Sequence, residues 1–215
     1  MAKLPSSKPL YLKIGNSRLT YWRGEGLAAS VVPKLSKKIS GIRFVKAGDV
    51  PLKLPYKSGI GIDRVLNVFS ATRLYPRESF LVVDFGTALT FEFFHSKKGY
   101  LGGWISPGAE MMSKALRDQT ALLPHIKIVP ATKTHRGGEN TKDSIQLGIQ
   151  NTLRGSVAAA VEAAAKILGS RNFRLIVTGG GAKVHLKELR KLRRLDHEPL
   201  LLLRGLKILH HDKLD

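Results

Sequence analysis

The 215-residue chain contains no cysteine, which excludes disulfide bonds and thiolate metal sites and is compatible with a reducing cytoplasm. Any metal must therefore be held by oxygen or histidine. No apolar run approaches the roughly 20 residues needed to cross a bilayer, and the opening "MAKLPSSKPLYLK" lacks the apolar core of a signal peptide. We expect a soluble cytoplasmic protein without membrane contact.

Acidic residues are also few: 16 Asp and Glu stand against 36 Lys and Arg, a formal net charge of +20. Such a surface attracts anions, which include nucleotides, nucleic acids and acidic membranes. The basic residues are dispersed except in "KVHLKELRKLRRL", residues 183–195, where leucines recur at near-helical spacing. We interpret this run as an amphipathic helix with a solvated basic face. A nucleic-acid helix is the weaker interpretation, because no stacking aromatics or known binding motif accompany it.

Several common catalytic signatures are missing as well. The chain has no HExxH pair, Walker loop, Gly-x-Ser-x-Gly elbow or Gly-x-Gly-x-x-Gly fingerprint. What it has instead is three apolar strands that each run into a glycine turn: "LYLKIGNS", "FLVVDFGTA" and "FRLIVTGGGA".

The first two of these strands align as a weak internal repeat. Lys13 pairs with Asp84, Gly15 with Gly86 and Asn16 with Thr87, and "RLTYW" then matches "LTFEFF". The repeat predicts two related halves, each bringing backbone N–H groups and hydroxyls toward a common cleft.

Three helices follow from periodicity and capping signals. One begins just after Gly61, and a second carries Glu110 in its first turn after the Gly- and Pro-rich loop "YLGGWISPG". The third is long, with Asn140 or Thr141 as N-cap and Gly169 as its stop. Gly148 and Gly155 share one face of it, where another helix, from the same chain or a second subunit, could approach closely.

Two carboxylates stand out as chemical candidates. Asp63 is a candidate general base beside Arg64, which suits an anionic substrate; an ordinary helix N-terminus would also favour an aspartate there. Asp84 ends an apolar strand, where a carboxylate is costly unless it binds a cation or accepts hydrogen bonds, and Thr87 offers a hydroxyl to phosphate. The glycines of "TGGGA" would let backbone pack against a planar group such as adenine, and a tight strand-to-helix turn would look the same.

In order along the chain, these motifs resemble the type III pantothenate kinases, the family that includes the Bvg accessory factors. "KIGNS" looks like the family's first phosphate motif, and "SVVP" is similar to a later strand end. The segments that follow in register are "PYKSGIGIDR", "DFGTALT", "GGWISPG", "ENTKDSIQLGI", "VTGGGA" and "LLLRGL".

The resemblance implies an α/β protein with the duplicated ribonuclease-H-like fold of the superfamily of acetate and sugar kinases, heat-shock chaperones and actin. We expect an N-terminal lobe over residues 1–75, with the phosphate loop and the Gly-x-Asp-Arg segment. The C-terminal lobe over residues 76–215 would hold the cation and phosphate turn, the substrate loop, the dimer helix and the adenosine turn. A homodimer is implied too.

The resemblance also implies ATP-dependent phosphorylation of pantothenate to 4'-phosphopantothenate, the first step of coenzyme A biosynthesis, assisted by Mg²⁺ and by K⁺ or NH₄⁺. Asp63 would deprotonate the pantothenate hydroxyl, and Asp84 would hold the monovalent cation. The pantothenate-binding residues would be Tyr56, Gly61, Ile62, Asp63, Arg64 and Thr141. The ATP-binding residues would be Lys13, Ile14, Gly15, Asn16, Ser17, Thr87, Gly179 and Gly180, with the first phosphate loop running from Lys13 to Thr20.

Two features depart from the family pattern. Where the family's first motif opens with an aspartate, this chain has Lys13. A lysine has no acceptor for magnesium or for a metal-bound water, although it could contact phosphate directly. Only twelve residues lie between Ser17 and Ser30, so we expect a trimmed first lobe with a less enclosed ATP and an exposed sheet edge.

Three hypotheses follow. The first is a pantothenate kinase, whose base and substrate motifs are intact. The second is a catalytically impaired relative that binds pantothenate in a regulatory role, which Lys13 and the short lobe favour. The third, a nucleic-acid binder, rests on the charge alone.

Overall fold

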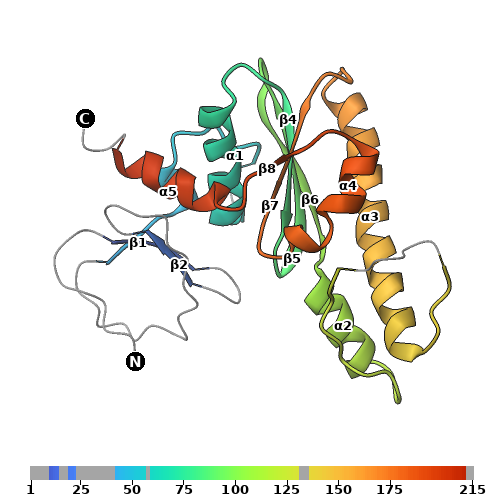
Figure 1. Cartoon of the computed structure of the whole chain (residues 1–215). Helices are drawn as coiled ribbons and strands as arrows, with labels where there is room; N and C mark the ends of the chain where they lie inside the picture. The colour runs from blue at the N-terminus through green and yellow to red at the C-terminus, as the bar shows by residue number, and fades with distance from the viewer. Residues whose placement is uncertain (1–9, 15–18, 23–41, 57–58, 131–135, 212–215) are drawn as a thin grey trace. The chain divides into compact units, whose positions relative to one another are not determined.

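The computed structural model describes residues 10–14, 19–22, 42–56, 59–130 and 136–211. The chain forms two compact units, residues 1–74 with 200–215 and residues 75–199 (Figure 1). The predicted lobe boundary after residue 75 lies one residue from this division. Residues 200–215, however, were expected in the C-terminal lobe and group with the first unit. Among the described residues, no helix is both long and apolar enough to cross a membrane.

The second unit is built on a five-stranded sheet in the order β6-β5-β4-β7-β8. The antiparallel pairs are β4–β5 and β5–β6, and the parallel pairs are β4–β7 and β7–β8. Its strands are β4 (Phe80–Phe85), β5 (Ala88–His95), β6 (Gly99–Pro107), β7 (Arg174–Thr178) and β8 (Asp196–His197). The helices are α2 (Ala109–Asp118), α3 (Thr141–Ile167) and α4 (Leu186–Leu192), with a 3-10 turn, η2, over Ala182–Val184.

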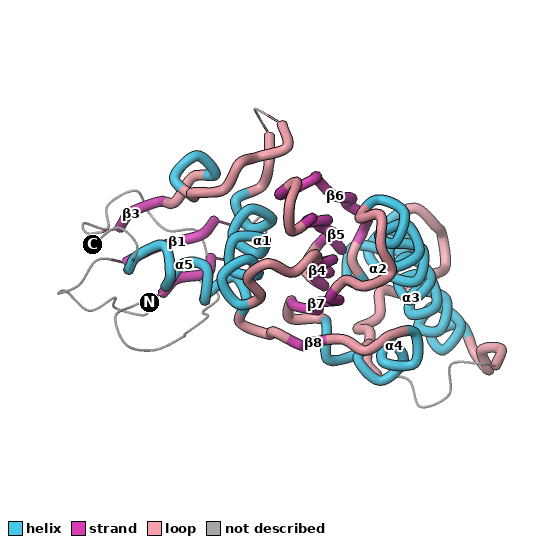
Figure 2. The backbone as a smooth tube through the Cα atoms, turned by 90° about the horizontal axis from the view of Figure 1, so that it is seen from above, coloured by secondary structure: helices cyan, strands magenta, loops and turns pink. Residues whose placement is uncertain are grey.

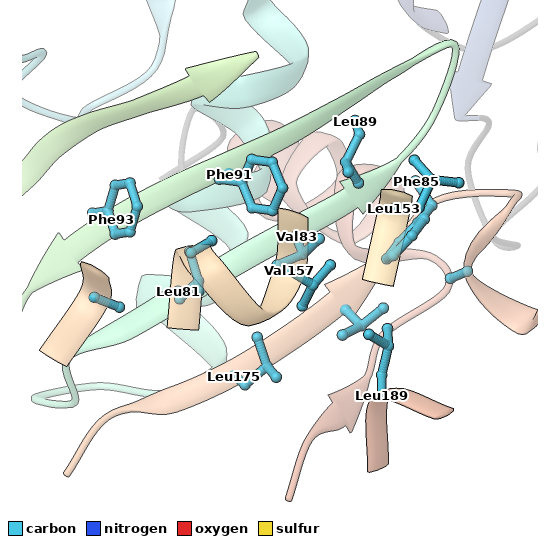
Figure 3. Packing of buried hydrophobic residues seen from close by; sticks show 14 of the residues in the cluster. Leu81, Val83, Phe85, Leu89, Phe91, Phe93, Leu153, Val157, Leu175 and Leu189 are labelled. Atoms are coloured by element: carbon cyan, nitrogen blue, oxygen red, sulfur yellow. The ribbon is translucent and has the colours of Figure 1, made fainter. Parts of the chain in front are cut away.

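Helices α3 and α4 lie along one face of the sheet, and α2 packs against α3 beyond the ends of the strands (Figure 1 and Figure 2). Alternate residues of the strands face them, as the period of two requires, and pack on the apolar stripe of α3 (Figure 3). Leu153 and Val157 of α3 are almost completely buried, at 1% and 0% exposure. The strand side chains in this core are Leu81, Val83, Phe85, Leu89, Phe91, Phe93, Leu175 and Val177.

The long helix has the ends that the sequence predicts. The Asn140 side chain accepts the backbone N–H of Asp143 at 3.0 Å, which makes Asn140 the N-cap. Gly169 follows the helix with φ of +62°, the left-handed conformation that glycine adopts most readily.

The first unit holds a three-stranded sheet in the order β2-β1-β3. Its elements are β1 (Leu10–Ile14), β2 (Leu19–Trp22), β3 (Ile42–Phe44), a 3-10 turn, η1 (Ala47–Asp49), α1 (Ile62–Leu74) and α5 (Leu201–His211). Helices α1 and α5 approach closely at Gly205, where an added Cβ would lie 2.8 Å from the carbonyl oxygen of Leu66. This packing explains why α5 belongs to the first unit although it follows the second in sequence.

The two sheets share one motif, an antiparallel hairpin with a parallel strand on the other side of its first member. In the first unit β1 pairs with β2 and β3, and in the second β4 pairs with β5 and β7. Lys13 lies opposite Thr20, and Asp84 lies opposite Thr90. The two related halves expected from the repeat, and the duplicated ribonuclease-H-like fold implied by the family resemblance, are therefore present, with Lys13 and Asp84 at corresponding positions.

Two sequence expectations need correction. The segment "YLGGWISP", expected as a loop, belongs to β6, which pairs with β5 over its whole length. Its glycines fit because β6 is an edge strand, and Gly102 takes φ of +99° beside a bulge between Phe93 and Phe94 of β5. The helix expected over residues 183–195 is shorter than predicted. It ends at Leu192, whose side chain is 42% exposed.

Candidate active site

The first group of predicted site residues lies at the N-terminus of α1. The carbonyl oxygen of Gly61 accepts the N–H groups of Arg64 and Val65 at 3.1 and 3.2 Å, so the helix starts directly after it. Asp63 is half-buried in the first turn. A carboxylate there is stabilised by the positive end of the helix dipole.

The absence of a side chain at Gly61 makes room for the Asp63 carboxylate. A Cβ added at residue 61 would lie 2.5 Å from Oδ1 of Asp63. The carboxylate therefore turns back over the start of the helix, which gives the Gly-x-Asp spacing a steric meaning that the sequence alone did not provide.

Arg64 and Tyr56 form the second part of this group. The Arg64 guanidinium donates to the Tyr56 hydroxyl at 3.1 Å, and Arg64 is only 6% exposed whereas Tyr56 is 43% exposed. The hydrogen bond thus ties a buried cation to an accessible aromatic side chain. Ile62 lies between Gly61 and Asp63 as the first residue of α1.

The second group of site residues lies at the end of β4 in the other unit. Asp84 is opposite Thr90 of β5 and opposite Thr178 of β7, so the three side chains share one face of the sheet. Both threonines are nearly buried, at 9% and 3% exposure. The sequence analysis missed them, because only the strand register places them beside Asp84.

Glycines hold the turns of this unit tightly together. Gly179, with φ of +94°, faces Asp84 so closely that an added Cβ would lie 2.3 Å from Oδ1. The N–H of Gly181 donates to the carbonyl of Phe85 at 2.9 Å. At Gly108, a Cβ would lie 2.5 Å from the carbonyl oxygen of Thr87. The structure therefore places Gly179 against Asp84, with Thr87 exposed in the turn after β4.

Two further predicted residues of this unit are exposed. Gly180 follows Gly179 in the same turn. Thr141 is the first residue of α3, next to its N-cap. Within the described parts of the chain, no hydrogen bond of the Thr141 hydroxyl is found.

The first phosphate loop is described only in part. Lys13 and Ile14 end β1, whereas Gly15, Asn16 and Ser17 lie outside the described residues, as does "SVVP" at residues 30–33. The remaining predicted residues divide between the units: Tyr56 and Gly61–Arg64 belong to the first, and Asp84, Thr87, Thr141, Gly179 and Gly180 to the second.

The site residues can supply few ligands to a cation. Over the described ranges, no three histidine or acidic side chains gather into a metal cluster. Mg²⁺ bound with a nucleotide takes most of its ligands from phosphate and water and needs few carboxylates, and the Asp84 carboxylate suits one ligand position of a monovalent cation. The residues present therefore fit both ions as partners of a bound nucleotide.

Comparisons with known proteins agree on one family. The family model described as Type III pantothenate kinase matches residues 25–163. Among relatives with that name, the protein of Methylacidiphilum infernorum is 31% identical over 161 residues, which cover 74% of this chain and 58% of the relative. That of Persephonella marina is 35% identical over 175 residues, covering 75% and 66%, and that of Thermosipho africanus is 37% identical over 157 residues, covering 73% and 61%. The matches thus span about three-fifths of each relative's length.

A solved structure from Campylobacter jejuni, named for the Baf family of transcriptional activators, matches with a TM-score of 0.63. It covers 95% of this chain and 98% of its own at 19% identity, a likeness that speaks for the fold alone. The matched family model and the curated relatives lead to one conclusion: the chain belongs to the type III pantothenate kinase family.

Proposed function

We propose that this protein transfers the γ-phosphoryl group of ATP to the hydroxyl of pantothenate, forming 4'-phosphopantothenate and ADP. The observation that carries this proposal is the arrangement at the start of α1, where the Asp63 carboxylate turns back over Gly61 and Arg64 holds Tyr56. Phosphoryl transfer needs positioning and charge neutralisation more than covalent help, and one base to orient the nucleophile.

In this reaction Asp63 accepts the proton of the pantothenate hydroxyl while the hydroxyl oxygen attacks the γ-phosphorus of ATP. A half-buried carboxylate in a fixed orientation serves this role because a general base must be within hydrogen-bond reach of the proton that it removes. Arg64 neutralises the pantothenate carboxylate, and the exposed Tyr56, which Arg64 orients, forms part of the same binding surface. In the second unit, considered by itself, we assign the exposed Thr141 to pantothenate binding as well.

The nucleotide contacts are assigned to each unit by itself. In the second unit, Thr87 offers its hydroxyl to the phosphates and the backbone at Gly179 and Gly180 packs on the adenosine. In the first unit, Lys13 and the first phosphate loop are assigned to phosphate contacts. Asp84 holds K⁺ or NH₄⁺, flanked by the hydroxyls of Thr90 and Thr178. Mg²⁺, when bound with ATP, neutralises phosphate charge. Because ATP is the donor, the reaction belongs in the cytoplasm.

The test is a coupled assay of ADP release with pantothenate, ATP, Mg²⁺ and K⁺ or NH₄⁺, performed on the wild type and on Lys13→Asp. Pantothenate-dependent turnover of the wild type supports the proposal. A wild type without turnover that gains it in Lys13→Asp would instead identify an impaired relative, because the substitution restores the acceptor that the family pattern has at this position.

We also propose that the functional unit is a homodimer formed through α3. Gly148 and Gly155 are exposed on one face of this helix, and a Cβ added to either would meet no described atom within 4 Å. We assign this face of the helix to a second copy of the chain. Multi-angle light scattering tests this: the wild type should have twice the chain mass, and Gly155→Lys should shift it toward the monomer.

A further inference from the structure

The strongest unassigned feature is a side-chain clasp over the segment that leads into α3. Arg136 and Asp143 form a two-pronged ion pair, in which Nη1 donates to Oδ2 at 2.7 Å and Nη2 donates to Oδ1 at 3.1 Å. The same Nη1 also donates to the carbonyl of Gly137 at 2.9 Å. Such a fork fixes the orientation of both side chains, which a single contact between flexible groups does not.

Backbone contacts close the clasp into a ring. Oδ2 of Asp143 accepts the N–H of Glu139 at 3.0 Å, while the Asp143 N–H donates to the side chain of Asn140, also at 3.0 Å. The Glu139 N–H and the Arg136 guanidinium lower the pKa of Asp143, so the carboxylate stays ionised at neutral pH.

The segment is also pressed against the helix that it enters. A Cβ added at Gly138 would lie 2.2 Å from Oγ and 2.6 Å from the backbone nitrogen of Ser144. Glycine at 138 therefore permits a backbone path that another residue would block, and the ion pair holds the chain on that path.

Thr141 lies inside this ring, between the cap Asn140 and the clasp residue Asp143. Its own hydroxyl takes no part in the clasp. We propose that Arg136 and Asp143 are positioning residues that fix the first turn of α3 and thereby aim the Thr141 hydroxyl at pantothenate. This inference rests on the proposed function, because it takes Thr141 as a contact of that substrate.

A clasp that merely stabilises the helix start would have a different signature. If the clasp only stabilises the helix start, its variants should have a lower melting temperature than the wild type and the same substrate affinities. If it positions Thr141, the variants should have a changed KM for pantothenate, while the KM for ATP and the melting temperature stay nearly constant. Arg136→Lys is the informative variant, since lysine keeps the charge but lacks the planar fork.

The experiment measures both KM values, kcat and Tm for the wild type, Arg136→Lys, Arg136→Gln and Asp143→Asn. Lys191→Gln is the matched control, because Lys191 forms a similar exposed pair with Glu188 at 2.8 Å in α4. We expect the KM for pantothenate to rise about tenfold in the three clasp variants and less than about twofold in the control. A rise of less than about twofold in the clasp variants, or an equal rise in both KM values, overturns the inference.

A double-mutant cycle adds a readout that a structural role would not move. In a Thr141→Val background, Arg136→Gln should raise the KM for pantothenate no further, because the group that it positions is gone. Additive effects of the two substitutions would contradict the positioning role.

Calorimetric titration of pantothenate separates this inference from the proposed function. A wild type that binds pantothenate without turning it over overturns the kinase proposal, and the clasp is then judged by the same variants' Kd values. A wild type that neither binds nor phosphorylates pantothenate overturns both.

Discussion

At the scale of single residues, the start of α1 shows how a missing side chain can orient a reactive one. The Asp63 carboxylate occupies space that a Cβ at residue 61 would claim, at 2.5 Å from Oδ1. In our account this contact holds the general base in place, and its consequence can be measured.

Gly61→Ala should reduce kcat roughly 10- to 100-fold with little change in Tm. The added methyl group displaces the Asp63 carboxylate far enough to misalign it with the substrate hydroxyl. Steady-state kinetics and thermal melting measure the two quantities. Gly48→Ala is the control in the same unit, since no described atom beyond its chain neighbours lies within 4 Å of its added Cβ. Full activity of Gly61→Ala would show that the orientation of Asp63 does not depend on this glycine.

At the scale of secondary structure elements, α4 is held on the second unit by a buried histidine. His185, only 6% exposed, stacks on Phe85 with ring centroids 4.8 Å apart. Burial lowers the pKa of His185 from 6.5 to about 4, so the folded protein keeps this imidazole neutral.

The pH dependence of stability follows from that shift. Between pH 6.5 and about 4, the unfolded chain binds a proton at His185 that the folded chain does not, so acidification favours unfolding, and about 2 kcal/mol of stability should be lost between about pH 7 and 5. Urea unfolding across this range measures the loss. His185→Phe keeps an aromatic ring against Phe85 but cannot titrate, so its curve should be flatter. Parallel curves for the two proteins would contradict the assignment.

Local patterns predicted most of the elements, and long-range pairing decided the rest. The starts of α1, α2 and α3 follow from capping signals and periodicity at Gly61, Glu110 and Asn140. The strand β6 could not be predicted from its glycines, because only the ladder with β5 makes it a strand.

Some residues of the candidate site could be predicted from local motifs, and others are brought together only by the fold. Asp63, Arg64 and Asp84 were visible as motifs. Thr90 and Thr178 lie beside Asp84 because of the strand register. Arg136 contacts Asp143, seven residues further along the chain. No local sequence pattern predicts either arrangement.

At the scale of the whole molecule, the dominant property is the formal charge of +20. The proposed substrates, ATP and pantothenate, are both anions, so this charge should speed their encounter with the protein, and salt should screen the effect.

We expect kcat/KM for both substrates to fall roughly three- to tenfold between about 0.05 and 0.5 M salt, with kcat changing less, since screening acts on association. Initial-rate measurements at matched Mg²⁺ give these values. A kcat/KM that is constant or rises with salt would mean that the net charge serves another partner, and binding of random-sequence DNA or RNA at low salt would then be the next measurement.

The central claim is that Asp63 is the base of a pantothenate kinase, and direct detection of 4'-phosphopantothenate by mass spectrometry tests it most simply. The wild type should form the product from ATP and pantothenate. Asp63→Asn, of nearly equal size, should lose about 10²- to 10⁴-fold in rate while keeping its Tm and its affinity for pantothenate. Asp118→Asn, which changes an exposed aspartate paired with Arg117, should retain the wild-type rate. Product formation by Asp63→Asn at the wild-type rate would contradict the account.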